Sequence, residues 1–436
     1  MTLTLEDARD YALSHNKQLL NAREDISIME AQYRETRAQG LPQVQGNMDY
    51  MTNFGYEVEF SFGGGDPDPP DINYDVLDQG DEEILRLLTQ LMTPGGPSTI
   101  TMEDQMNAQF QVSQLIFSGQ FWVGLEIARI ARGMTEKQVE KTSLDVRQQV
   151  SNTYYLILVS EASLEILNRN LANLEETLRH TANMYETGMV EKADVDQIRM
   201  NVSQLKNTLE STRRSVQLSY NMLRIQLGLE RQKPIVLEDD LDYLLEKTQN
   251  NLVEEPMKPE VNLSWQLMDY QEKMQREMVD LERWSYAPTL SGFYSYTEKI
   301  MTTDFDLSPK NAAGLTLSVP IYSGGYRKAK LDQARVELDK ARRDKSLLED
   351  QLNLQENQLK YELRSALENY LTQKENVEVA TSVYNSYYNK YKQGMTSSLD
   401  LTQANNNYLQ AENNYISSVL KLLQARLALQ KLYNRL

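Results

Sequence analysis

The chain alternates between two hydrophobic periods, and the longer one dominates. Several segments place apolar or small side chains at a strict 4-3 spacing, which is the seam of a left-handed coiled coil. The clearest seam runs through Val150, Thr153, Ile157, Ser160, Leu164, Leu167, Leu171, Leu174 and Leu178. The same spacing recurs within 5–33, 359–387 and 401–432. These segments predict packed helices, and the uninterrupted stretches 120–185 and 325–391 would each extend on the order of 100 Å.

Two regions of the chain switch to a period of two. Between Val44 and Phe62 the even positions carry no charge, while the odd positions 43–59 carry almost nothing apolar. The alternation returns later in each half of the chain. Four strands of roughly nine or more residues, apolar on one face and polar on the other, are what the wall of a membrane-spanning β-barrel requires. The strands alone fit a soluble antiparallel sheet packed on a core equally well.

The connections between these strands favour the membrane interpretation. The stretch 63–98 is rich in Gly, Pro and Asp and is too long for a tight hairpin, which is typical of a loop at the outer mouth of a barrel. Four strands cannot close a barrel, because the smallest barrels have about eight. Open strand edges are not tolerated in lipid. A membrane protein of this kind must therefore be an oligomer.

The chain is internally duplicated. The stretch YETGMVEKADVDQ from Tyr185 is matched by YKQGMTSSLDLTQ from Tyr391, 206 positions later. LIFSGQ at Leu115 is matched by PIYSGG at Pro320, and the residues around Pro42 resemble those around Pro288. Each half therefore reads as short helix, strand, loop, strand, very long helix, turn and helix.

This duplication predicts three parts of the chain. The first repeat is 1–228, with strands at 43–62 and 105–117 and a helical hairpin that turns near 188. An irregular segment at 229–258 follows, interrupted by Pro234 and Pro256. The second repeat is 259–436, with strands at 288–300 and 312–322 and a hairpin that turns near 394.

The whole layout resembles the TolC-like outer membrane efflux protein family. The resemblance rests on LTLEDARDYALSHN at the start, LP before a strand, PIYSGGYRKAKLDQA after one, and two Tyr-x-x-Gly turns that each precede an Asp. It implies a mainly α fold with a transmembrane β-barrel portion. A homotrimer would form one twelve-stranded barrel in outer-membrane lipid and a long antiparallel coiled-coil α-barrel in the periplasm. The segment 229–258 would be the equatorial region outside this tunnel.

The resemblance also implies a function and partners. The protein would be a passive exit channel of a tripartite efflux or type I secretion system in a Gram-negative-type bacterium. It would work with a periplasmic adaptor (membrane fusion) protein and an inner-membrane transporter. Two alternatives stay open: a soluble, elongated coiled-coil scaffold, and a periplasmic adaptor protein, which would be expected to show one hairpin and several compact β-rich modules.

The two turns hold the candidate site residues. Gly188 and Gly394 suit positive φ at a helix end. Asp194 and Asp400 have the spacing of caps on the first turn of the next helix. The resemblance implies a second role for both, as rings of carboxylates at a periplasmic aperture, where they would favour cations.

The remaining turn residues have a structural and a functional interpretation. Tyr185 and Tyr391 are expected to pack the last turn before the chain reverses, or to form a hydrogen-bonded latch between helices. The resemblance implies that the exposed turn residues contact the adaptor. The residues so assigned are Tyr185, Gly188, Met189, Val190, Tyr391, Gly394, Met395 and Thr396.

Composition narrows the chemistry further. The chain has a net charge of −18, which argues against nucleic-acid binding. It has no Cys, and so no thiolate site and no lipidated N-terminal Cys. Its two His have no acidic partner at ligand spacing, so we expect no metal site, no cofactor and no enzymatic activity. No apolar run is long enough for a transmembrane helix, and a signal peptide is absent from this numbering. His15 lies on a predicted seam, which predicts a core or interhelical contact.

Overall fold

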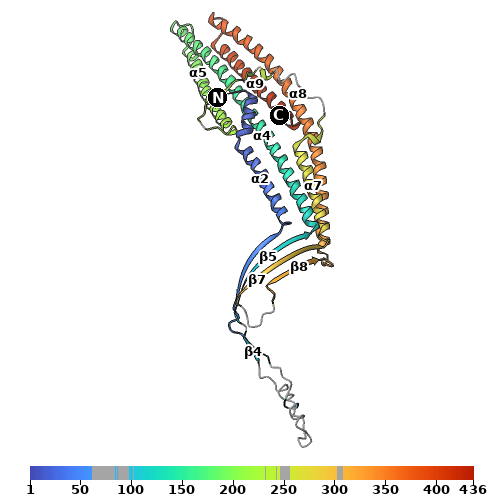
Figure 1. The fold of residues 1–436 in the computed structure, drawn as a ribbon. Coiled ribbons are helices and arrows are strands. Elements are labelled where there is room, and N and C mark those ends of the chain that lie inside the picture. The colour runs from blue at the N-terminus through green and yellow to red at the C-terminus, as the bar shows by residue number, and fades with distance from the viewer. Residues whose placement is uncertain are drawn as a thin grey trace. The chain divides into compact units, whose positions relative to one another are not determined.

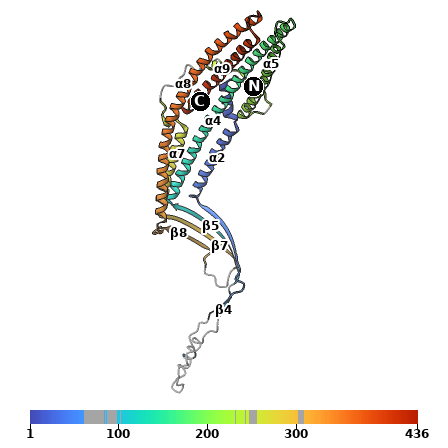
Figure 2. The ribbon, with the colours of Figure 1, turned by 180° about the vertical axis from the view of Figure 1, so that it is seen from behind.

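The computed structural model describes residues 1–60, 84, 86, 98–101, 103–230, 232–241, 243–245, 256–301 and 308–436. Most of the predicted outer loop at 63–98, and residues 231, 242 and 246–255 of the irregular segment, lie outside these residues. The chain divides into a helical unit (1–36, 122–285 and 324–436) and a sheet unit (37–121 and 286–323). Figure 1 and Figure 2 show the ribbon from opposite sides.

Two long helical hairpins dominate the helical unit. In the first, α4 (Gly119–Glu186) is followed by α5 (Lys192–Gln226), and in the second α8 (Tyr326–Lys392) is followed by α9 (Ser398–Leu432). The shorter helices are α1 (Leu5–His15), α2 (Lys17–Ala38) and α7 (Leu263–Trp284), and α7 lies along the first part of α8 (Figure 1). No helix within the described ranges is both long enough and apolar enough to cross a bilayer.

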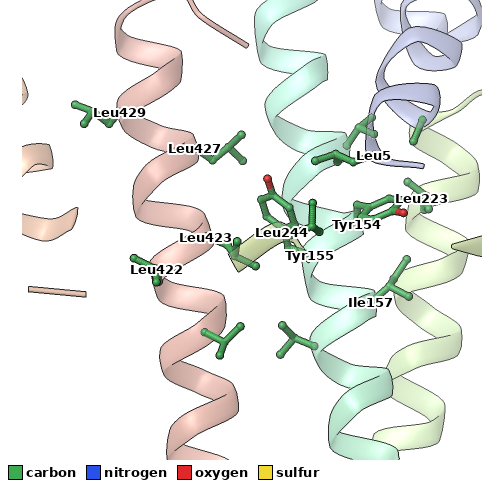
Figure 3. Close-up of a cluster of buried hydrophobic side chains, with 14 of the residues drawn as sticks. Leu5, Tyr154, Tyr155, Ile157, Leu223, Leu244, Leu422, Leu423, Leu427 and Leu429 are labelled. Atoms are coloured by element: carbon green, nitrogen blue, oxygen red, sulfur yellow. The ribbon is translucent and has the colours of Figure 1, made fainter. Parts of the chain in front are cut away.

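The core of the helical unit follows the predicted seams. Val150, Ile157, Leu167 and Leu174 on α4 are all buried. Side chains from α1, α4, α5 and α9 gather in one apolar layer with Leu244 (Figure 3). The 4-3 spacing places these residues on one face of each helix, so burying that face removes a continuous apolar stripe from water.

The prediction for His15 is wrong. The helix is interrupted at Asn16, which separates α1 from α2. The buried position after Ala12 is therefore one residue later than the predicted seam places it. Asn16 is therefore the buried side chain; its Nδ2 donates to the carbonyl of Gln226 (2.7 Å), and its Oδ1 accepts from the N–H of Leu19 (3.1 Å). His15 is exposed and stacks on Tyr11, with ring centroids 4.0 Å apart.

A four-stranded antiparallel sheet forms the sheet unit. Its order is β2 (Gln43–Met51), β5 (Gln105–Phe117), β7 (Thr289–Met301) and β8 (Asn311–Ser318). The stretch predicted as one strand at 43–62 is interrupted, because Phe54 (φ 51°) and Gly55 (φ 66°) turn the backbone out of the extended conformation. Beyond this break, β3 (Glu57–Phe60) pairs with β4 (Ser98–Thr101).

The strand register aligns the apolar positions of all four strands on one face. Val44 lies opposite Val112, which lies opposite Tyr294, which lies opposite Ala313. This face is uncovered: Val44 is 71%, Met48 64% and Leu315 73% exposed. Within the described part of the chain, β2 and β8 each pair on one side only. The sheet therefore presents an apolar face and two open edges.

Candidate functional site

The two hairpin turns share one backbone geometry. The N–H of Met189 donates to the carbonyl of Met184 (2.8 Å), and the N–H of Gly188 donates to that of Tyr185 (3.0 Å). The second turn repeats both bonds, from Met395 to Lys390 (2.9 Å) and from Gly394 to Tyr391 (2.9 Å). This is the Schellman pattern that ends a helix, and it requires positive φ at the glycine. Gly188 and Gly394 have φ of 73° and 70°.

Each turn is followed by an aspartate that caps the next helix. Asp194 Oδ2 accepts the backbone N–H of Glu191 (3.1 Å) at the start of α5. Asp400 Oδ2 accepts the hydroxyls of Ser397 (2.7 Å) and Thr396 (3.0 Å) at the start of α9. The structure thus shows a capping box at both positions. Capping uses only part of each carboxylate, so it leaves room for a second role.

The two aspartates differ in what else they contact. Asp194 is half-buried, and its Oδ1 accepts a hydrogen bond from the hydroxyl of Ser398, which joins α5 to α9. Asp400 is exposed, and its described partners all lie in its own turn. The hydrogen bonds from Ser397 and Thr396 lower the pKa of the Asp400 carboxyl. Asp400 is therefore charged and open to solvent, whereas Asp194 is engaged between the hairpins.

The two tyrosines also differ. Tyr391 is 2% exposed and packs with Tyr384 and Leu401, and burial raises the pKa of its hydroxyl. Its hydroxyl lies 2.6 Å from Oγ1 of Thr181 on α4. Tyr185 is 46% exposed. The interpretation as a packing residue therefore applies to Tyr391 and not to Tyr185.

Sequence reasoning did not identify several residues that join the two hairpins. Lys392 pairs with Glu176 (3.3 Å), which links α8 to α4, and His180 lies edge-on to Tyr391 with ring centroids 6.2 Å apart. Ser398 and Thr181, described above, also join the two hairpins. None of these residues has a distinctive spacing in the sequence, because each depends on which helix lies beside its own.

The turn tips are exposed. Met189 and Met395 both project into solvent, and Val190 and Thr396 beside them are partly exposed. Methionine is flexible and polarisable, and so adapts to many partner shapes. The described residues contain no group of side chains that could hold a metal ion. The site is consequently a pair of exposed tips joined by polar contacts between the hairpins.

The sequence profile of the outer membrane efflux protein family matches residues 90–229 and 266–435. Among curated proteins, the chain is similar to the toluene efflux pump outer membrane protein TtgC of Pseudomonas putida. The two are 23% identical over 332 residues, which is 70% of this chain and 66% of that protein, slightly less than two thirds of its length.

Among solved structures, the chain shares the fold of two proteins. It matches CusC, described in terms of transmembrane channel formation, with a TM-score of 0.76 and 14% identity over 98% of this chain and 91% of that one. It matches the outer membrane protein VceC of Vibrio cholerae with a TM-score of 0.72 and 14% identity over 99% of this chain and 96% of that one.

Proposed function

Because this chain belongs to the outer membrane efflux protein family, we propose that it is the passive, trimeric exit channel of an efflux or secretion system. Three copies place their sheets in the outer membrane as one barrel and their helices in the periplasm as one tunnel. A periplasmic adaptor and an inner-membrane pump deliver the cargo. The channel itself needs no cofactor and catalyses no reaction.

The sheet carries this proposal. Its apolar face is uncovered, with Val44, Met48 and Leu315 all strongly exposed, and it has open edges at β2 and β8. In water, such a face would cost free energy in proportion to its apolar area. In lipid, the apolar face is in a favourable environment. The N–H and C=O groups at the two open edges still lack hydrogen-bond partners there, unless another strand pairs with them. Pairing β8 of one copy with β2 of the next satisfies both edges and closes a barrel.

The proposed aperture lies at the hairpin turns. Asp400 is exposed and charged, so three copies would present a ring of carboxylates to the tunnel entrance. Such a ring favours cations and repels anions. Asp194 contributes less to the ring's field, because one of its oxygens accepts the Ser398 hydroxyl.

The exposed tips are the proposed adaptor contacts. Met189, Val190, Met395 and Thr396 form the tips, with Tyr185 beside the first one. Gly188 and Gly394 set the shape of each tip through positive φ. Replacing both methionines by Lys would weaken adaptor binding without affecting insertion into the outer membrane.

Single-channel conductance in planar bilayers tests the proposal. We expect discrete openings for the wild type, with a cation preference that falls in Asp400→Asn. Asp194→Asn should change selectivity less. If Asp400→Asn inserts with unchanged selectivity, the channel proposal stands, but Asp400 only caps its helix and does not set the selectivity. A folded, detergent-purified protein that never inserts would contradict the channel itself.

A further inference from the structure

One charged side chain in the helical unit has a buried donor without a partner. The Nε of Arg426 on α9 is buried and makes no hydrogen bond to any residue that the structure describes. Arg426 also forms no ion pair within this part of the chain, although the sequence has 63 acidic residues against 45 Lys and Arg. Buried polar groups in folded proteins are nearly always paired with protein, water or an ion. Arg426 therefore has room for a partner that the single chain does not supply.

A second donor faces the same region. Leu423 and Leu427, on either side of Arg426 in the sequence, are buried in one apolar layer with Tyr155 of α4 (Figure 3). Figure 3 shows Tyr154 and Tyr155 pointing to opposite sides of α4, with the Tyr155 hydroxyl directed toward α9. Tyr155 is 8% exposed, and its hydroxyl has no hydrogen bond within the described ranges.

A second arginine adds positive charge at this place. Arg9 of α1 is buried; its Nε donates to the hydroxyl of Ser151, one turn before Tyr155 (2.8 Å), and its guanidinium pairs with Glu6 (3.1 Å). Burial lowers the pKa of the Arg426 guanidinium, Tyr155 partly opposes this, and the charge of Arg9 lowers it further. Glu6 offsets the charge of Arg9, so the charge of Arg426 remains uncompensated.

The other acidic side chain that acts on Tyr155 is engaged elsewhere. Asp239 accepts the backbone N–H of Leu5 (2.6 Å) and the hydroxyl of Tyr154 (2.9 Å). Because Tyr154 points away from Tyr155, these bonds hold the carboxylate on the opposite side of α4 from the Tyr155 hydroxyl (Figure 3). Asp239 is therefore no partner for Arg426.

We propose that Arg426, Tyr155 and Arg9 form a binding site for a small oxyanion, such as inorganic phosphate, between α9, α4 and α1. A guanidinium presents N–H groups in a planar fork that matches two oxygens of an oxyanion. The Tyr155 hydroxyl adds one O–H donor, and burial raises its pKa, which keeps it protonated. The anion supplies the acceptor that the Arg426 Nε lacks and compensates its charge.

This site is separate from the proposed aperture. The part of α4 between Tyr155 and its last residue, Glu186, spans about 45 Å. The anion would join α1, α4 and α9 far from the hairpin turns, and it would stabilise the folded state because the unfolded chain has no such site. The site neither requires the channel nor excludes it.

Phosphate binding by the detergent-purified protein tests the site. Equilibrium dialysis with radiolabelled inorganic phosphate measures binding. Melting temperatures are recorded in a buffer whose only anion is chloride, and again with added phosphate or sulfate. The variants are Arg426→Met, Tyr155→Phe and, as the matched control, Arg214→Met, which changes an exposed arginine on α5.

We expect saturable binding and a melting temperature that rises with phosphate concentration. Binding should fall roughly tenfold in Arg426→Met, by a smaller factor in Tyr155→Phe, and not at all in Arg214→Met. In chloride alone, Arg426→Met should melt no lower than wild type, because it removes an unpaired charge and keeps an apolar side chain. In saturating phosphate it should melt lower than wild type, because only wild type gains the anion.

Three outcomes would overturn the site. The first is folded protein that binds no phosphate. The second is a loss of stability in Arg426→Met that is equal with and without phosphate, which would identify a protein carboxylate, such as one from a neighbouring copy, as the partner. The third is an equal loss of binding in Arg214→Met, which would mean that phosphate associates with exposed arginines in general. Each of these leaves the channel proposal to the conductance measurement.

Discussion

The hydroxyl of Tyr391 lies 2.6 Å from Oγ1 of Thr181, and this pair joins the second helical hairpin to the first. Both residues are buried, and the Thr181 hydroxyl also donates to the carbonyl of Thr177 (2.8 Å). Tyr391 is therefore the donor in the pair. The bond fixes α8 against α4 next to the turns, where the aperture is proposed.

Tyr391→Phe should loosen the two hairpins with little loss of packing. Thr181 keeps its bond to Thr177, so we expect a loss of about 1 kcal/mol in stability. The melting temperature in detergent measures this loss, and channel recordings should show more frequent openings. Tyr361→Phe on α8 is the control and should leave both unchanged, since Tyr361 is 73% exposed. Equal effects of the two changes would contradict the latch.

Gly394→Ala should destabilise the second turn through the backbone alone. Gly394 has φ of 70°, and an added Cβ would meet no atom within 4 Å. The left-handed conformation costs a non-glycine residue about 1 kcal/mol. Gly124→Ala is the matched control: it also meets no atom within 4 Å, but it lies inside α4, where Ala is favoured by about 0.5–1 kcal/mol. The two changes should thus shift the melting temperature in opposite directions.

Glu356 should make the helical unit sensitive to acid. Burial tends to raise the pKa of this carboxyl, but hydrogen bonds from Lys360, Tyr433 and the N–H of Met257 outweigh burial and lower it. A lowered pKa means that the carboxylate stabilises the fold above the ordinary Glu pKa of about 4.3. This stabilisation is lost as the pH falls from there through the lowered value.

Glu356→Gln tests this acid sensitivity. It should cost about 1–3 kcal/mol at pH 7, because Lys360 loses its charged partner, and much less near pH 3. Melting temperatures between pH 3 and pH 7 measure the difference. Glu375→Gln, an exposed change on the same helix, should show no such pH dependence. A constant cost of Glu356→Gln across this range would contradict the assignment.

The duplication predicts the strand register between copies. Gln111 of β5 lies opposite Ser295 of β7. The match of Leu115 with Pro320 places Thr316 of β8 where Gln111 stands in β5, and the match of Pro42 with Pro288 places Asp49 of β2 where Ser295 stands in β7. Thr316 of one copy should therefore lie opposite Asp49 of the next copy. Because the chain has no Cys, Thr316→Cys with Asp49→Cys should form disulfide-linked trimers in membranes, seen on non-reducing gels.

Two variants check this register. Gln111→Cys with Ser295→Cys should cross-link within one chain and give no covalent oligomer. Thr316→Cys with Met48→Cys should not cross-link, because a one-residue shift places the second Cys on the opposite face of the sheet. Cross-linking of the Met48 pair in place of the Asp49 pair would shift the register and refute the prediction.

The fold class was predictable because each period in the sequence reports a backbone geometry. The 4-3 seam through Val150 and Ile157 identifies buried helix faces, and the alternation around Val44 identifies strands. Local conformation was less predictable. The break at Asn16 depends on a hydrogen bond to distant Gln226, and the positive φ of Phe54 belongs to a tight turn closed by the bond from Tyr56 to Asn53; the hydrophobic periodicity predicts neither.

The candidate site was only partly predictable, for a similar reason. The glycines and aspartates of the turns act within a few residues of themselves, so their spacing predicts their conformation. The bond between Asp194 and Ser398 joins helices of different hairpins. Nothing in the local sequence of Ser398 distinguishes it from any other serine at a helix start.

The repeat also bears on how such a protein could have arisen. A chain of half this length would hold two strands and one hairpin, and six identical copies of it would close the ring that three copies of this chain are proposed to form. Fusion of two such copies into one chain would allow the two halves to diverge. Asp194 meets a serine within the chain, whereas the matching position of the other half is Lys192. A chain of two fused halves can therefore hold a different side chain at each of two matching positions, as Ser398 and Lys192 show, which six identical half-length copies could not do.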